Sequence, residues 1–276
     1  MTAGGPRDDT RTVELTRSLA KLRARLAKAA EAVGRRPADI ELLPVTKFFP
    51  ATDIAILNRL GCRAVGEARD QEARKKIAAL AGLQKPAAES PAGEIAWHMV
   101  GQIQHNKAKS VAAWAHTVHS VGSARIAAAL DRGALTALSS GVRTQPLRVY
   151  VQLSLDGDTA RGGVDIGDTE AVDALCDRVA TAGSLDLVGV MGVPPLNSDA
   201  ADAYARLAAE HQRVLRRHPT AVGLSAGMSQ DLEEAVKHGS TCVRVGTALL
   251  GPRPLTSPAV VTPVTPSSQV PPPPDR

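Results

Sequence analysis

The chain has 276 residues, of which 43% are hydrophobic and 22% charged, and these are ordinary values for a globular protein with a buried core. Only 2% of the residues are aromatic, too few to supply the row of stacking rings that a single-stranded nucleic-acid platform needs. The net charge of +5 resides in the first 36 residues, which hold nine basic and four acidic side chains. The remainder is balanced, so the charge pattern predicts no nucleic-acid partner.

The three cysteines, Cys62, Cys176 and Cys242, are far apart and form no C-x-x-C motif. Such a sparse, odd set is typical of reduced thiols in a cytoplasmic protein. No apolar run approaches the roughly 18 residues of a membrane span, and the first ten residues contain no apolar signal segment. We therefore expect a soluble cytoplasmic protein that binds no membrane.

Both ends of the chain are predicted to be disordered tails. Residues 1–10 are polar and contain glycine and proline, and nine of the 25 residues in 252–276 are proline. Proline runs cannot enter the interior of a helix or a sheet. Residues 11–251 are therefore predicted to form one folded domain.

Within this domain, helical and extended patterns alternate. The first element is a helix predicted over 12–33, where an apolar stripe of Leu15, Leu19, Leu22, Leu26 and Val33 lies opposite basic side chains. Short apolar runs predict eight strands, at 40–46, 64–66, 95–100, 116–121, 148–153, 187–191, 221–224 and 242–245. Helical patterns separate most of them, at 51–60, 70–80, 123–138, 169–182, 199–217 and 231–238.

This alternation predicts an α/β fold with a parallel sheet covered by helices. Eight units in about 240 residues match a single-domain (β/α)8 TIM barrel, which typically takes about 250 residues. A doubly wound open sheet is the alternative. No G-x-G-x-x-G follows the first strand, which weakens the dinucleotide-binding version of that alternative.

In such a barrel the active site lies at the carboxyl ends of the strands. The first strand ends at Lys47, the only charged residue between Glu41 and Asp53. A lysine in apolar surroundings loses its proton more readily, and the neutral amine is the form that makes a Schiff base with a carbonyl compound. Alternatively, Lys47 extends past its two phenylalanine neighbours into solvent.

The next two strand ends carry weaker signals. Glu67 either pairs with a cation inside the mouth or starts the following helix, where an acidic side chain suits the dipole. Gln104, Asn106 and Lys107 are expected at the rim, and His98 within the strand packing. His116 and His119 lack a third ligand nearby, so no metal site is predicted.

The last two strand ends predict an anion site. Ser225 and Ser229 enclose a glycine at the start of a helix, with Ser229 a suitable N-cap, and small residues at a helix N-terminus leave backbone N–H groups free. Arg244 and Gly246 end the eighth strand on one face, and barrels commonly bind phosphate after strands seven and eight. Alternatively, the serines only cap the helix and Arg244 forms a buried salt bridge. Together with Lys47, these residues predict a site for a phosphorylated aldehyde.

At these residues the sequence resembles the pyridoxal phosphate homeostasis protein family, the YggS-like proteins. The resemblance covers nearly the whole chain between the tails. Its motifs are 44–47 with Pro50; Gly66 and Glu67 with Gln71 and Glu72; Trp97, His98, Gly101, Gln104, Asn106 and Lys107; 189–191 with Pro194 and Pro195; Leu224, Ser225, Gly227, Met228 and Ser229; and 240–247 with Gly251.

The resemblance implies a fold-type III barrel, as in the N-terminal domain of alanine racemase, with pyridoxal 5′-phosphate (PLP) bound as an aldimine on Lys47. By the same analogy, the phosphate is held by Ser225, Ser229, Gly246 and Thr247, and Arg244 approaches the pyridine nitrogen. The chain departs from the family pattern at Ala68, Ala226 and Arg161, where the family often has Asn, Met and Lys.

These features favour a binding protein for PLP homeostasis without strong catalytic turnover. An arginine at the ring nitrogen cannot accept its proton, which leaves the ring a poorer electron sink. The expected partners are PLP and PLP-dependent apoenzymes, and the expected state is a monomer or weak dimer. The alternatives are a fold-type III enzyme with weak amino-acid racemase activity and a Schiff-base aldolase acting on a phosphorylated sugar.

Overall fold

The structure is a computed structural model that describes residues 6–83, 94–196 and 198–253. Its strands, in chain order, are β1 (Glu41–Pro44), β2 (Ala64–Glu67), β3 (Ala96–Met99), β4 (Thr117–Val121), β5 (Leu147–Ser154), β6 (Val164–Asp165), β7 (Leu185–Gly192), β8 (Gly223–Ser225) and β9 (Cys242–Val245). Its helices are α1 (Pro6–Ala32), α2 (Ala51–Arg59), α3 (Asp70–Leu83), α4 (Ala108–Trp114), α5 (Ala124–Ser139), α6 (Thr169–Thr181), α7 (Ala200–Arg217), α8 (Leu232–Lys237) and α9 (Thr247–Leu250). Short 3-10 turns lie at Pro37–Asp39, His105–Lys107 and Thr159–Arg161.

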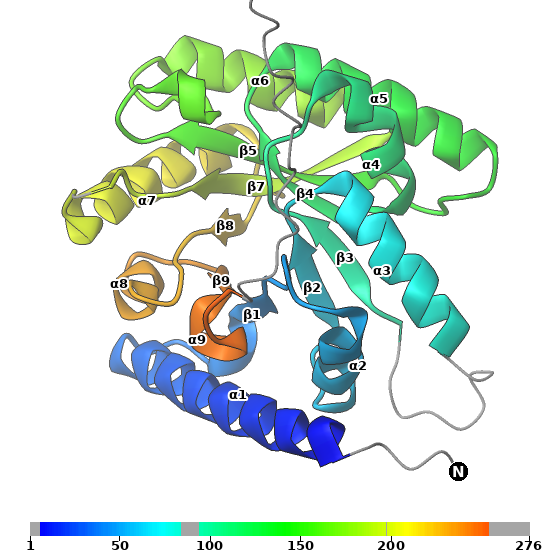
Figure 1. The fold of residues 1–276 in the computed structure, drawn as a ribbon. Helices are drawn as coiled ribbons and strands as arrows, with labels where there is room; N and C mark the ends of the chain where they lie inside the picture. Colours follow the sequence, from blue (N-terminus) through cyan, green and yellow to red (C-terminus); the bar gives the residue numbers. More distant parts are fainter. Residues whose placement is uncertain (1–5, 84–93, 197, 254–276) are drawn as a thin grey trace, which may run out of the picture.

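The strands form one parallel sheet that curls into a nearly closed barrel (Figure 1). Neighbouring strands follow the order β1-β9-β8-β7-β5-β4-β3-β2, and the short β6 pairs with β5 outside this path. β1 meets β2 through a bridge between Val45 and Gly66 and through a hydrogen bond of 2.9 Å from the Thr46 amide to the Gly66 carbonyl. The (β/α)8 barrel is therefore confirmed, and the open-sheet alternative is excluded.

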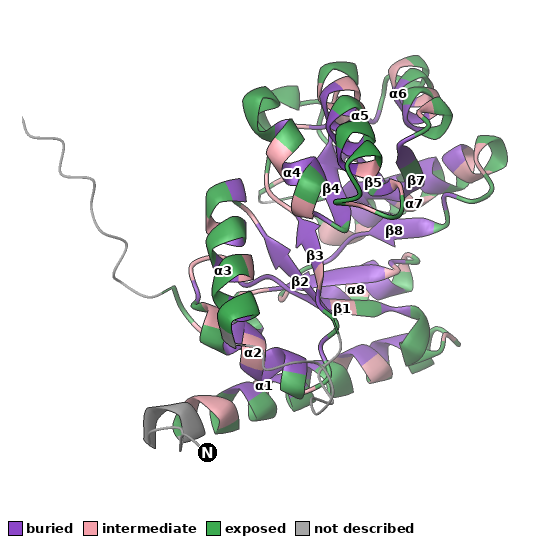
Figure 2. Cartoon of the chain, turned by 90° about the vertical axis from the view of Figure 1, so that its right-hand side faces the viewer, coloured by how far each residue is buried: buried purple, intermediate pink, exposed green. Residues whose placement is uncertain are grey.

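Burial separates the two layers of the barrel (Figure 2). The strands are buried along almost their whole length, while each outer helix is buried on one side and exposed on the other. This burial agrees with the sequence, in which the strands are continuous apolar runs. Such runs are typical of a parallel sheet covered by helices. The cysteines Cys62, Cys176 and Cys242 are all free and buried.

Helix α1 covers the outer face of β9, the last strand, which is followed in the chain by the short helix α9. Its side chains Leu15, Leu19, Leu22 and Leu26 are almost fully buried against α8, α9, α2 and the outer face of β9. Each buried leucine contributes about 2 kcal/mol of transfer free energy. The fifth member of the predicted stripe, Val33, lies beyond the helix end and is exposed.

The start of the first helix differs from the predicted one, and two short helices are additional. Helix α1 begins at Pro6, so residues 6–10 of the predicted N-terminal tail are helical, while residues 1–5 and 254–276 lie outside the described residues. Helices α4 and α9 are not predicted by the sequence pattern, because they span only seven and four residues and show no full apolar period.

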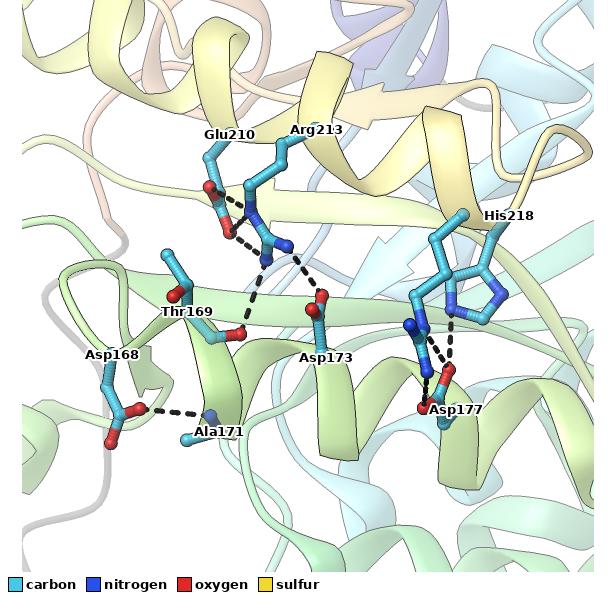
Figure 3. Close-up of polar contacts among 9 residues, drawn as sticks. Asp168, Thr169, Ala171, Asp173, Asp177, Glu210, Arg213 and His218 are labelled. Atoms are coloured by element: carbon cyan, nitrogen blue, oxygen red, sulfur yellow. Dashed lines mark hydrogen bonds and ion pairs between the residues drawn. The ribbon is translucent and has the colours of Figure 1, made fainter.

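Ion pairs join the neighbouring outer helices α6 and α7 (Figure 3). Arg213 of α7 reaches Asp173 of α6 at 2.7 Å, and Arg217 reaches Asp177 at 2.6 Å. The hydrogen bond from Arg217 lowers the pKa of Asp177. Such partly exposed pairs stabilise little individually, but two in register fix how the helices align. None of the helices in the described ranges has the length and hydropathy that a membrane span requires.

Candidate functional site

Lys47 lies at the carboxyl end of β1, in the turn that leads to α2, and its side chain is half-buried. Within the described part of the chain, no side chain or backbone group forms a hydrogen bond or ion pair with it. Its two aromatic neighbours diverge: Phe49 is buried in the cluster beneath α1, and the Phe48 ring lies between the guanidinium groups of Arg69 and Arg253. The amine is thus available for chemistry.

Glu67, at the end of β2, pairs with a cation, which is one of the two roles predicted for it. Its Oε1 accepts hydrogen bonds from Nζ of Lys76 at 2.8 Å and from Oγ1 of Thr46 at 2.5 Å. Burial raises the pKa of Glu67, and the Lys76 charge acts in the opposite direction. The carboxylate therefore connects β1, β2 and α3 behind the Lys47 turn.

The ends of β1 and β9 lie side by side, which brings Lys47 near the predicted phosphate loop. The Val45 amide donates to the Val245 carbonyl at 2.7 Å, so Lys47 and Thr247 each follow this pair by two residues. Gly246 is the N-cap of α9, and Thr247 is its first residue. The first amides of a helix have no acceptor within the helix.

Ser229 joins the loop after β8 to this helix start. Its Oγ accepts a hydrogen bond from the Ala248 amide at 3.4 Å. The prediction that Ser229 caps the next helix is wrong: α8 starts at Leu232 with Asp231 as its N-cap, because the chain makes a turn before entering the helix. Ser229, Gly246 and Thr247 are nevertheless brought together.

Ser225 and Arg244 lie deeper, inside the barrel. Nη1 of Arg244 donates to Oγ of Ser225, and Nη2 donates to the Gly192 carbonyl at 3.1 Å. Within the described ranges no carboxylate lies within 4.0 Å of the guanidinium, so the salt-bridge alternative for Arg244 is not found. Burial lowers the pKa of Arg244. A buried cation with no counter-ion is costly, so an electron-rich partner at this place would be stabilised.

A chain of hydrogen bonds continues from Ser225 across the barrel interior. Nδ1 of His119 lies 2.8 Å from Oγ of Ser225, and Nε2 of His119 lies 3.0 Å from Nδ1 of His98. Burial lowers the pKa of His98 to about 3 and holds the pKa of His119 well below its usual value. Both imidazoles are therefore neutral at pH 7.

His98 also lines a cavity of about 170 Å³ at the opposite end of the barrel, where the strands begin. Arg63, His116, Arg148 and Glu41 share the lining, so the walls carry both signs of charge. This cavity is separate from the mouth that holds Lys47. The interior histidines thus connect the two ends of the barrel.

The predicted rim residues Gln104, Asn106 and Lys107 are all exposed around the turn after β3, as expected. Three polar residues of this region, His98, His119 and Lys76, are not among the site residues predicted from the sequence. A signal for Lys76 is present in the sequence, because it lies four residues after Glu72 on the same helix and therefore on the same face.

Comparisons with known proteins agree with this geometry. The family model for the N-terminal domain of alanine racemase matches residues 18–254. A pyridoxal phosphate homeostasis protein of Mycobacterium tuberculosis (strain H37Rv) is 60% identical over 248 residues, which cover 90% of this chain and 96% of that protein. The chain belongs to the pyridoxal phosphate homeostasis protein family.

Other family members and solved structures extend the comparison. The pyridoxal phosphate homeostasis protein of Escherichia coli K12 is 32% identical over 87% of this chain and 97% of its own. PipY of Synechococcus elongatus PCC7942, whose structure has PLP bound, is 29% identical with a TM-score of 0.69 over 86% of this chain and all of its own. Alanine racemase of Streptomyces coelicolor A3(2), at 16% identity and a TM-score of 0.64, shares the fold over 86% of this chain and 58% of its own.

Proposed function

We propose that this protein binds PLP covalently and reversibly through Lys47, and so buffers or delivers the cofactor inside the cell. The observation that supports the proposal is the adjacency of β1 and β9, which brings the backbone at Lys47, whose amine has no partner among the described residues, close to the Gly246–Thr247 turn. The name of the M. tuberculosis relative and the PLP bound to PipY point to the same ligand.

The residues of the mouth fit the chemical groups of PLP. The Lys47 amine forms a C=N bond to the aldehyde carbon, and the aldehyde oxygen leaves as water. Ser229, Gly246 and Thr247 offer a hydroxyl and helix-start amides to the phosphate, as anion sites at helix N-termini do. Arg244 lies within the barrel below, where a buried cation without a counter-ion suits the lone pair of the ring nitrogen.

The structure gives Ser225 a second role in this arrangement. Its hydroxyl is fully buried and is occupied by Arg244 and His119. We therefore assign Ser225 to holding the Arg244 guanidinium, and the phosphate contacts to Ser229, Gly246 and Thr247.

A binding role is favoured over the racemase alternative by the positions of the tyrosines. Racemases of this barrel class use a tyrosine as the opposite base, whereas Tyr150 and Tyr204 are both buried here. The Tyr204 hydroxyl donates to Asp231 at 2.7 Å, and burial raises the pKa of both phenols. Neither is placed to exchange protons with a ligand in the mouth.

Delivery follows from the chemistry of the link. Water reverses the C=N bond, so PLP held in this way can be released to PLP-dependent apoenzymes, which we propose as the recipients. Transfer is measured by mixing the loaded protein with an apoenzyme and following the enzyme's recovered activity. A trap for free PLP distinguishes direct transfer from release into solution.

The site itself is tested by spectroscopy and mass mapping. Wild-type protein with PLP is expected to show a visible absorbance band that borohydride abolishes, leaving one reduced adduct on Lys47. Lys47→Ala should lose the adduct and keep the fold, whereas the matched control Lys107→Ala at the exposed rim should retain it. An adduct that persists on another lysine in Lys47→Ala would overturn the assignment.

A further inference from the structure

The two peptide groups on either side of Lys47 are both held by side chains of α3. The Thr46 carbonyl accepts a hydrogen bond from Nζ of Lys76 at 2.9 Å, and the Phe48 amide donates to Oε1 of Glu72 at 2.6 Å. Lys76 and Glu72 lie one turn apart on α3 and bond to each other at 2.7 Å. One ion pair therefore holds the backbone immediately before and after the reactive lysine.

The turn that this ion pair holds has an unusual backbone. Phe48 has a φ of 69°, in the left-handed region that bulky residues rarely adopt. Such a conformation persists only where the surroundings determine it. The Glu72 bond to the Phe48 amide and the guanidinium groups of Arg69 and Arg253 over its ring provide those surroundings. The backbone conformation at Lys47 thus depends on side chains of α3.

Lys76 is a second amine close to the turn, and its contacts make it unreactive. It is buried, and its three hydrogen bonds go to the Thr46 carbonyl, Glu67 and Glu72. The lysine side chain has three N–H donors, so two carboxyl groups and one carbonyl use all of its donor capacity. An amine that is buried and fully hydrogen-bonded is held away from an aldehyde in the mouth. Lys47 has no such partner among the described residues.

We propose that Glu72 and Lys76 are positioning residues for Lys47: they fix the peptide groups that flank it, and the hydrogen bonds that hold the Lys76 amine in place leave Lys47 as the amine to which the aldehyde bonds. This inference rests on the proposed function, because it takes Lys47 to be the amine that binds PLP. It also explains why Gly66-Glu67 and Gln71-Glu72 stand together in the sequence motif: their carboxylates meet at one ammonium group.

The kinetic test uses Glu72→Ala, Glu72→Gln and the control Lys75→Ala, whose side chain is exposed on the same helix. PLP is mixed with each apoprotein, the visible band is followed with time, and the reduced adduct is mapped. Glu72→Ala should attach PLP about tenfold more slowly or worse, because the amine is misplaced. Glu72→Gln keeps an acceptor for the Phe48 amide and should recover most of the rate, and Lys75→Ala should match wild type. Attachment by Glu72→Ala at the wild-type rate would overturn the proposal.

A second test needs no variant and is independent of folding defects. The wild-type apoprotein is treated with a low concentration of formaldehyde and cyanoborohydride, and methylation of each lysine is followed by mass spectrometry. Lys47 is expected to react at least about tenfold faster than Lys76, whose three N–H donors are all engaged. Equal rates would refute the assignment of Lys76 as a held, unreactive amine. Failure of the proposed function is distinguishable, since it would show as the absence of a PLP adduct on Lys47 in wild type.

Discussion

Nδ1 of His119 lies 2.8 Å from Oγ of Ser225, and this contact joins Arg244 to the hydrogen bonds across the barrel interior. Arg244 donates to the same hydroxyl, and a guanidinium group can only donate. We predict that the Ser225 hydrogen is directed to Nδ1 of His119, which is then unprotonated. On this prediction His119 carries its proton on Nε2 and donates to Nδ1 of His98, and His98 also carries its proton on Nε2.

The prediction is that both histidines are neutral Nε2–H tautomers at pH 7. Nitrogen-15 NMR of histidine-labelled apoprotein distinguishes the two ring nitrogens directly. In Ser225→Ala, His119 loses the donor that selects its tautomer, and its signals should change most. Leaving a buried acceptor and a buried donor unpaired should also lower the free energy of unfolding by about 1–3 kcal/mol. Observation of an Nδ1–H tautomer at either histidine in wild type would contradict the assigned direction.

Acid should destabilise this protein through the same histidines. Burial lowers the pKa of His98 from 6.5 to about 3, so between these values the unfolded chain binds a proton that the folded chain does not. Stability falls wherever the unfolded state binds more protons and the pH decreases. One such histidine changes the free energy of unfolding by about 1.4 kcal/mol per pH unit, lost progressively as the pH falls from 6.5 towards 3. His119 acts with the same sign.

Urea unfolding at several pH values measures this dependence. In His98→Gln, the loss of unfolding free energy between pH 6.5 and pH 4.5 should be smaller than in wild type by about 2 kcal/mol. The matched control is His105→Gln, because His105 is exposed and lies outside the barrel interior. An unchanged pH dependence in His98→Gln would show that His98 titrates normally in the folded protein.

The barrel could be predicted because its signals are local. Each strand is a short apolar run, and each longer helix carries an apolar stripe, so their alternation is visible along the chain. The position of Lys47 at a strand end could also be predicted, since a lone charge after an apolar run is a local feature. The closure of the barrel between Val45 and Gly66 has no sequence signal of its own, but it follows from the count of eight strand–helix units.

The interior of the site could not be predicted in the same way, because its contacts join distant strands. His98 and His119 are 21 residues apart, and His119 and Ser225 are 106 residues apart. Which hydroxyl meets which imidazole depends on the strand register, which the sequence pattern does not specify. The sequence pattern places Ser225 in the loop predicted to bind phosphate, but it does not show that the Ser225 hydroxyl contacts Arg244 and His119.

Two helical glycines offer a matched test of packing against the outer layer. A Cβ on Gly133 of α5 would lie 2.9 Å from Cα of Lys109 in α4, so Gly133→Ala should destabilise the protein by about 1–3 kcal/mol. A Cβ on Gly82 of α3 would meet no atom of the described residues outside its own helix within 4 Å, and Gly82→Ala should stabilise by about 0.5 kcal/mol through helix propensity. Thermal unfolding of both variants measures the difference. A neutral Gly133→Ala would show that α4 and α5 are farther apart than the structure has them.

Arg244→Glu tests the proposal that Arg244 lies at the ring nitrogen of bound PLP. In wild type the guanidinium donates to Ser225 and to the Gly192 carbonyl and cannot take up a ring proton, so the bound ring should be a weak electron sink. A carboxylate there would favour a protonated ring nitrogen but would face the Gly192 carbonyl and weaken an anion-binding mouth.

Two separable changes are therefore expected in Arg244→Glu: weaker PLP binding, and faster exchange of the α-hydrogen of an amino acid per molecule of bound PLP. Deuterium incorporation from heavy water, divided by the absorbance of the bound cofactor, measures the second change. Arg244→Gln is the control, because it removes the positive charge without adding a carboxylate. If wild type exchanges rapidly and Arg244→Glu loses that exchange, Arg244 supports catalysis and the racemase alternative is favoured. If neither exchanges, the absence of an opposite base limits the reaction, which agrees with the burial of Tyr150 and Tyr204.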